Sequence, residues 1–164
     1  MPNTDIATGF VYDFRLSDQS PPIMDFEMAE SVTLSEGDPI TIDAGYVRMA
    51  VAGEPVLGVV VGSIYPGWDG SYTSGVGEHL ALKVCVALED VIFRVMDTNA
   101  APTIAARGTK VVMAGTSGSI AVNSGDTATT DFLLLDRAWA DSISGNVWGP
   151  QMQWVGSFAN RVMG

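Results

Sequence analysis

Cysteine and histidine are almost missing from this sequence of 164 residues, which has one of each, Cys85 and His79. A single cysteine excludes a disulfide within the chain. Because a zinc site needs several Cys and His ligands, the sequence predicts no such site. Cys85 lies in the apolar run 80–88, where we expect a buried and unreactive thiol.

Basic residues are also few, with 8 Lys and Arg against 19 Asp and Glu and a net charge of −11. An acidic surface repels phosphate backbones, so we expect no direct contact with nucleic acid. The excess of acids is expected mainly to keep a chain that is 47% hydrophobic in solution.

Long apolar runs are missing as well. None approaches the roughly 20 residues that a membrane-spanning helix needs, and no basic region followed by an apolar stretch indicates a signal peptide. We therefore expect no membrane partner and folding in a reducing cytoplasm.

Motifs for catalysis are scarce. Any Ser-His-Asp arrangement would depend on His79, which we expect to lie on the surface at the end of a loop. The glycines of 75–77 and 115–118 lack the strand-to-helix context of a phosphate loop, and the acids lack the spacing of a calcium loop. We predict no catalytic residue, cofactor or metal; an enzyme remains an alternative that loss of activity in His79→Ala would support.

Short β-type runs and turn residues are what the sequence has in abundance, with 18 Gly and 8 Pro. The block 31–62 alternates apolar runs with turns that contain Gly, Asp or Pro, which predicts a compact antiparallel meander. Further strands are expected at 80–87, 91–95, 108–113, 119–122 and 130–135, with a long surface loop at 65–77 and a short helix at 102–106. The apolar residues of 132–139 are also compatible with a helix, and we choose a strand followed by a turn. The predicted fold class is all-β and mainly antiparallel.

The chain divides into an N-terminal arm (1–28), a β-domain (29–136) and a Trp-rich C-terminal segment (137–164) that packs on the domain or contacts a partner. Aromatic residues in the first and last parts are candidates for a protein interface, since aromatic anchors dominate interface energetics. The candidates are Phe10, Tyr12, Phe14, Trp139, Trp148, Trp154 and Phe158. The alternative for each is a place in the core.

Turn and strand motifs between residues 30 and 136 resemble those of the head decoration, or capsid cement, proteins of tailed bacteriophages. The resemblance rests on Gly37-Asp38-Pro39-Ile40, Asp43-Ala44-Gly45-Tyr46-Val47, Ala50 and the stretch from Gly53 to Val60. The stretch from Ala105 to Val112 is similar to a later element of that family.

The resemblance implies a small β-barrel or β-tulip-like sandwich that often forms a homotrimer. It also implies a structural role on the exterior of the virion. There such proteins bind the major capsid protein of an assembled head and tie neighbouring capsomers together, and they have no catalytic residues. An alternative is a β-sandwich that binds a carbohydrate or host-surface ligand through Trp68 and Tyr72.

Overall fold

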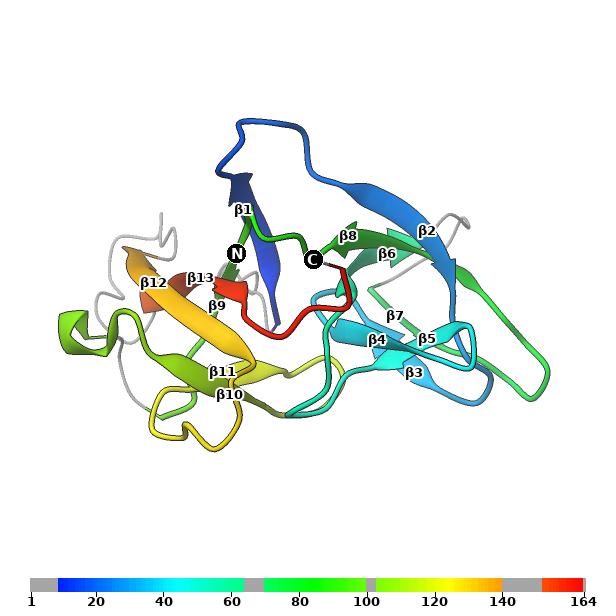
Figure 1. Cartoon of the computed structure of the whole chain (residues 1–164). Coiled ribbons are helices and arrows are strands. Elements are labelled where there is room, and N and C mark those ends of the chain that lie inside the picture. Colours follow the sequence, from blue (N-terminus) through cyan, green and yellow to red (C-terminus); the bar gives the residue numbers. More distant parts are fainter. Residues whose placement is uncertain (1–8, 64–69, 100–102, 140–151, 164) are drawn as a thin grey trace, which may run out of the picture.

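A computed structural model describes residues 9–63, 70–99, 103–139 and 152–163, leaving out the side chains of residues 138, 139 and 152. This part of the chain is built of antiparallel sheets and a short 3-10 helix, η1, at Ile104–Ala106. The predicted all-β, mainly antiparallel fold class is thus confirmed. The described strands form no closed barrel, and the arrangement is that of a sandwich (Figure 1).

Six strands form the larger sheet, in the order β1, β9, β13, β12, β10, β11. Their bounds are Val11–Arg15, Val91–Val95, Met152–Phe158, Phe132–Trp139, Lys110–Ala114 and Ala121–Asn123. The predicted hairpin of the second half is present as β10 and β11, and the apolar run near residue 132 is strand β12, as expected.

Five strands form the second sheet, in the order β2, β8, β6, β4, β5. Their bounds are Ile23–Glu27, Ala81–Val86, Gly58–Ser63, Pro39–Asp43 and Tyr46–Met49. A separate pair consists of β3 (Thr33–Ser35) and β7 (Ser71–Thr73).

The block 31–62 is therefore not the simple meander that we expected. Strands β4 and β5 form the predicted hairpin, but β6 pairs with the other side of β4. Strand β3 pairs with β7, which lies inside the predicted loop 65–77. Turn chemistry predicts where strands end, whereas these pairings join residues far apart in the sequence.

Two apolar clusters lie on opposite faces of the five-stranded sheet. Neighbouring residues of a strand point to opposite faces, and Val59 and Val60 of β6 are both fully buried, one in each cluster. The first cluster joins this sheet to the six-stranded sheet, whose largest side chains in the cluster are Phe93, Phe132, Trp154 and Phe158. The second contains Leu34 of β3 and packs against Tyr72 of β7.

Residues 11–27, here called the N-terminal strap, contribute an edge strand to each large sheet. Strand β1 pairs with β9, and β2 pairs with β8 (Figure 1). Between them, the amide of Leu16 donates to the carbonyl of Asp90 at 2.8 Å, and the amide of Val86 donates to the carbonyl of Pro22 at 2.9 Å. The described part of the predicted arm is thus integral to both sheets.

The C-terminal segment is also integral to the sheets. Strand β13 lies between β9 and β12, so the C-terminal segment supplies an interior strand of the six-stranded sheet. No helix in the described ranges is long and apolar enough to cross a membrane.

Candidate interaction surface

The N-terminal strap carries apolar side chains that the fold leaves exposed. Phe14 is 44% exposed, Leu16 66% and Met24 50%, and Ile23 is exposed as well. Single exposed apolar residues are ordinary, but these four all lie within residues 14–24, which makes the strap a candidate contact surface. The strap is an edge of both sheets, so these side chains can reach a partner without any change in the core.

An ion pair anchors the strap between its two strands. The guanidinium of Arg15 donates from Nε to Oδ2 of Asp90 at 2.9 Å and from Nη2 to Oδ1 at 3.0 Å. The hydroxyl of Ser17 also donates to Asp90. The hydrogen bond from Ser17, followed by those from Arg15, lowers the pKa of Asp90 below its ordinary value.

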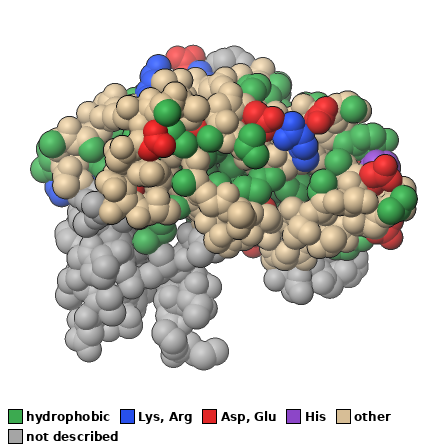
Figure 2. Space-filling view, turned by 90° about the horizontal axis from the view of Figure 1, so that it is seen from below, with side chains coloured by type: hydrophobic (Ala, Val, Ile, Leu, Met, Phe, Trp, Pro, Cys, Tyr) green, Lys and Arg blue, Asp and Glu red, His purple; other side chains and the backbone are tan. Residues whose placement is uncertain are grey.

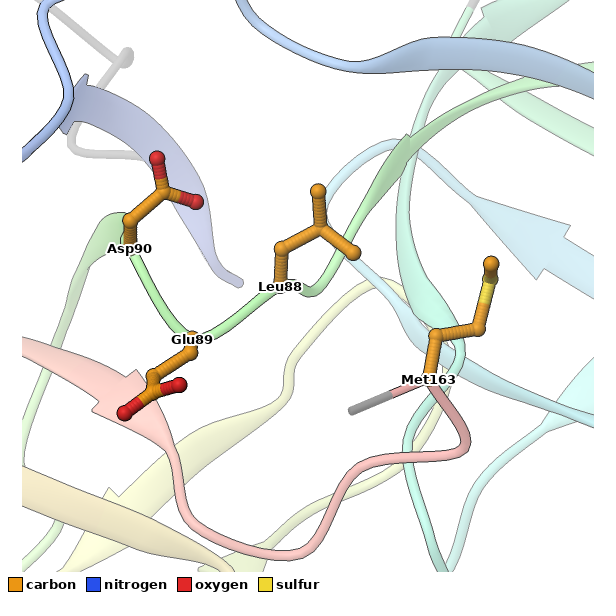
Figure 3. A pocket seen from close by; sticks show the side chains of 4 residues that line it. All are labelled: Leu88, Glu89, Asp90 and Met163. Carbon is orange, nitrogen blue, oxygen red and sulfur yellow. The ribbon is translucent and has the colours of Figure 1, made fainter.

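A cleft of about 480 Å³ opens beside the strap, where the chain passes from β8 to β9. Leu88, Glu89, Asp90 and Met163 line it (Figure 3). The cleft is shallow and open to solvent, so it lacks the enclosure that is typical of a small-molecule pocket.

Asp38 fastens the five-stranded sheet to the six-stranded one. Its side chain is fully buried and accepts hydrogen bonds from the amides of Ser35 at 2.8 Å and Gly118 at 2.9 Å, and from the hydroxyl of Ser117. Ser117 and Gly118 follow β10, so this carboxylate holds a turn of the opposite sheet. Burial raises the pKa of Asp38, and the three hydrogen bonds offset part of that effect.

Asp131 makes the reciprocal connection from the six-stranded sheet. It is fully buried and accepts hydrogen bonds from the amide of Gly53 at 2.8 Å, the amide of Met113 at 3.1 Å and the hydroxyl of Thr129 at 2.6 Å. Gly53 lies in the turn between β5 and β6 of the five-stranded sheet. Each sheet therefore supplies a buried carboxylate that binds a glycine amide in a turn of the other sheet.

Three of the predicted interface residues lie in the core. Phe10 and Phe158 are 1% exposed, Trp154 is 0% exposed, and the ring centroids of Phe10 and Phe158 are 4.6 Å apart. The indole Nε1 of Trp154 donates to Asp97 Oδ2 at 3.0 Å, which satisfies its polar atom. These side chains have no free surface in this fold, because they fill the space between the two large sheets.

The other predicted interface residues have different positions. Tyr12 packs partly against the first apolar cluster, and Phe14 is exposed on the strap. The backbone of Trp139 ends β12, but its side chain lies outside the described part, as does all of Trp148. Of the candidates that can be placed, Phe14 has the accessible side chain that a protein contact requires.

Cys85 and His79, which were considered for other functions, have different surroundings. Cys85 is buried, and burial raises the pKa of its thiol to about 12, so it is protonated at neutral pH. His79 is exposed at the end of a loop, stacks on Tyr46 with ring centroids 3.9 Å apart, and has Nδ1 2.9 Å from the carbonyl oxygen of Met28. Among the described residues, no three His, Cys, Asp or Glu side chains are grouped to hold a metal ion.

Of the two residues predicted to bind a carbohydrate, Trp68 and Tyr72, the structure describes only Tyr72. Trp68 lies outside the described residues, and Tyr72 is half-buried against the second apolar cluster, with its hydroxyl 3.5 Å from Glu78 Oε2. The ring face of Tyr72 is thus partly occupied by the core.

Sequence reasoning missed Leu16, Ile23 and Met24 as surface residues. The available signal was their position on both sides of the polar, proline-containing stretch 17–22, where no core can form locally. Figure 2 shows another face of the molecule, on which hydrophobic side chains gather near the middle and basic side chains are few. Comparison with family models, curated proteins and solved structures finds no match to this chain.

Proposed function

We propose that this chain is a structural protein that decorates the outside of an assembled bacteriophage head and stabilises contacts between neighbouring capsomers. Its partner is the major capsid protein of the same virus, and its working form is a homotrimer. The observation that carries this proposal is the exposed apolar series of the N-terminal strap, which lies at an edge of both large sheets.

The strap suits a contact with another protein. Burial of apolar surface contributes about 25 cal/mol per Å², and Leu16 and Met24 are half or more exposed before any partner binds. The strap is held to the sheets by strand pairing and by the Arg15–Asp90 ion pair. It is therefore ordered in advance, which lowers the entropic cost of docking.

Adhesion alone accounts for a cementing effect. Many symmetric copies on one shell multiply modest contacts through avidity. A protein that binds the assembled head more tightly than free capsid subunits stabilises the assembled state by mass action. Neither effect requires a catalytic residue.

The test is co-sedimentation of the full chain with empty heads built from that major capsid protein. Wild-type protein is expected to pellet with the heads. The double variant Leu16→Ser/Met24→Ser is expected to bind at least about tenfold more weakly, equivalent to about 1.4 kcal/mol.

The matched control is Val76→Ser/Ile104→Ser, which removes two other exposed apolar side chains, 89% and 57% exposed. This control is expected to bind as the wild type does. Wild-type protein that stays in the supernatant with heads of its own virus would overturn the proposal. Equal binding by the strap variant and the wild type would remove the strap as the contact.

A further inference from the structure

Strand β2 of the strap is an open edge of the five-stranded sheet. It pairs with β8 on one side and is the last strand in the order on the other (Figure 1). The amide of Met28 donates to the carbonyl of Leu80, which continues the register of β2 with β8. Because backbone groups alternate in direction along a strand, the even-numbered residues of β2 bond to β8. The amides and carbonyls of Asp25 and Glu27 therefore face outward.

Only the C-terminal end of this edge is covered within the described part of the chain. There the amide of Ala29 donates to the carbonyl of Val47 at 2.8 Å. Among the described residues, no hydrogen bond engages the outward backbone groups of Asp25 and Glu27. Apart from Phe26, the residues of β2 are exposed. An unpaired edge of this kind is a template on which another strand can pair.

The side chains along this edge favour a basic strand. Asp25 and Glu27 lie on the same face of β2, because alternate residues of a strand point the same way. Asp25 Oδ1 is 3.3 Å from Lys83 Nζ, whereas no ion pair or hydrogen bond within the described ranges engages the exposed carboxylate of Glu27. On the other face, Met24 is half exposed and Phe26 packs on the second apolar cluster.

A second copy of β2 is a poor occupant of this edge. It would bring its own Asp25 and Glu27 beside those already present, and like charges on adjacent strands are destabilising. A strand with basic residues on one face and apolar residues on the other has the opposite effect. It would match the unpaired Glu27 and extend the apolar surface of Met24.

We propose that the outer edge of β2 binds an extended basic segment of a partner protein as an added strand, with a lysine or arginine beside Glu27. The added backbone satisfies the outward amides and carbonyls, and the basic side chain gives the pairing its specificity. The net charge of −11 favours approach of such a segment. The inference rests on the proposed function only for the identity of the partner, the major capsid protein.

The first test uses short capped peptides and no capsid. Protein labelled with ¹⁵N is titrated with a peptide that alternates valine and lysine, and with a valine–glutamate peptide as the charge control. A third peptide is the valine–lysine peptide methylated at successive central backbone nitrogens, which cannot complete a ladder of hydrogen bonds.

We expect the valine–lysine peptide to slow hydrogen exchange at the amides of Asp25 and Glu27 by at least about tenfold at saturation. The other two peptides are expected to leave these rates unchanged. The amides of Met24 and Phe26, which face β8, are internal controls. Unchanged exchange with the valine–lysine peptide would overturn the proposal, and so would equal protection by either control peptide.

Two substitutions at Glu27 separate charge from backbone pairing. Glu27→Lys is expected to bind the valine–lysine peptide at least about tenfold more weakly and the valine–glutamate peptide more tightly than the wild type does. Glu27→Pro removes the outward amide, which an edge strand tolerates, and is expected to bind neither peptide. The matched control, Glu36→Lys, reverses an exposed carboxylate outside β2 and is expected to keep the preference of the wild type. A Glu27→Lys variant that also keeps that preference would overturn the pairing at Glu27.

The second test uses the empty heads. Glu27→Lys is expected to bind them at least about tenfold more weakly than the wild type, a difference of about 1.4 kcal/mol, whereas Glu36→Lys is expected to bind normally. Normal binding by Glu27→Lys would overturn β2 as the contact with the head, while the proposed function would stand. Failure of the wild type to bind heads, together with protection by the valine–lysine peptide, would reject the proposed function and leave the strand-addition site in place.

Discussion

Asp38 and Asp131 show how single residues hold this molecule together. Each is fully buried, and each accepts hydrogen bonds from three donors, one of which is a glycine amide in a turn of the opposite sheet. A buried carboxylate is tolerated when such donors satisfy it. The two residues therefore link the two sheets by hydrogen bonds, in addition to the apolar cluster that packs between the sheets.

Asp38→Ala tests this role. The substitution leaves the amides of Ser35 and Gly118 and the hydroxyl of Ser117 without their acceptor, so we expect a loss of about 3 kcal/mol in the free energy of unfolding. Urea unfolding followed by tryptophan fluorescence measures it. The control, Glu36→Gln at an exposed position nearby, is expected to change stability by less than about 0.5 kcal/mol. Equal midpoints for both variants would contradict the role assigned to Asp38.

The pH dependence of Asp38 is a second test at this scale. Its folded pKa lies above the ordinary value of 3.8 because of burial, so the folded state binds the proton more tightly than the unfolded state. This group therefore contributes stability that is fully present below pH 3.8 and is lost as the pH rises through the folded pKa. The stability of the wild type relative to Asp38→Asn is expected to fall as the pH rises from 3.8. A relative stability that increases over this window would mean that the hydrogen bonds outweigh burial.

At the scale of elements, β13 is the strand on which the larger sheet depends. It lies between β9 and β12, and a Cβ added at Gly156 would lie 2.1 Å from the carbonyl oxygen of Leu133 and 2.6 Å from the Phe132 ring. Those neighbours are backbone and a fully buried ring, so neither can move easily. Glycine at this position is what lets β12 and β13 approach each other.

Gly156→Ala is accordingly expected to destabilise the fold by about 2–4 kcal/mol, since overpacking in a filled core forces the backbone to shift. The matched control is Gly75→Ala, where the new methyl group meets the carboxylate of Glu78, the end of a flexible side chain. We expect the control to change the midpoint of thermal unfolding much less. Comparable losses in the two variants would show that the contact at Gly156 relaxes readily.

The N-terminal strap is the other element whose behaviour can be predicted. Arg15→Gln removes the two hydrogen bonds that the Arg15 guanidinium donates to Asp90. We expect severalfold faster hydrogen exchange at Leu16, whose amide bonds the Asp90 carbonyl, and unchanged exchange in β12 and β13. Mass spectrometry of deuterated peptides measures both regions. Uniform acceleration across the chain would indicate global destabilisation instead.

At the scale of the whole molecule, two sheets share one core while a strap runs along both. The amide of Leu16 in the strap donates to the carbonyl of Asp90, which also lines the cleft, so the strap borders the cleft.

The proposed homotrimer predicts a mass in solution of about three times 17.3 kDa. Light scattering coupled to size exclusion measures this mass for the free protein. The same measurement on the strap variant Leu16→Ser/Met24→Ser shows whether the strap contacts the capsid or another copy of the chain. An unchanged mass in that variant is expected if the strap faces the capsid. Dissociation to monomers would assign the strap to the contact between copies.

Local chemistry in the sequence determined much of the fold. Alternating apolar residues and Gly, Asp and Pro turns were sufficient to predict the β4–β5 and β10–β11 hairpins, the buried Cys85 and the all-β class, because these depend on neighbours within a few residues. The composition also showed that the chain has few residues of the types that act as nucleophiles or metal ligands, with one Cys and one His.

Only the tertiary structure decided which strands pair and which aromatic residues are hidden. The same alternation is compatible with β6 beside β4 or beside β5, and with Trp154 in the core or on the surface. Those choices depend on how residues distant in the sequence fill common space. The hydrogen bonds of the buried carboxylates also depend on residues that are distant in the sequence. Asp38 and Gly118 are 80 positions apart, and no local sequence pattern predicts that Asp38 accepts a hydrogen bond from Gly118.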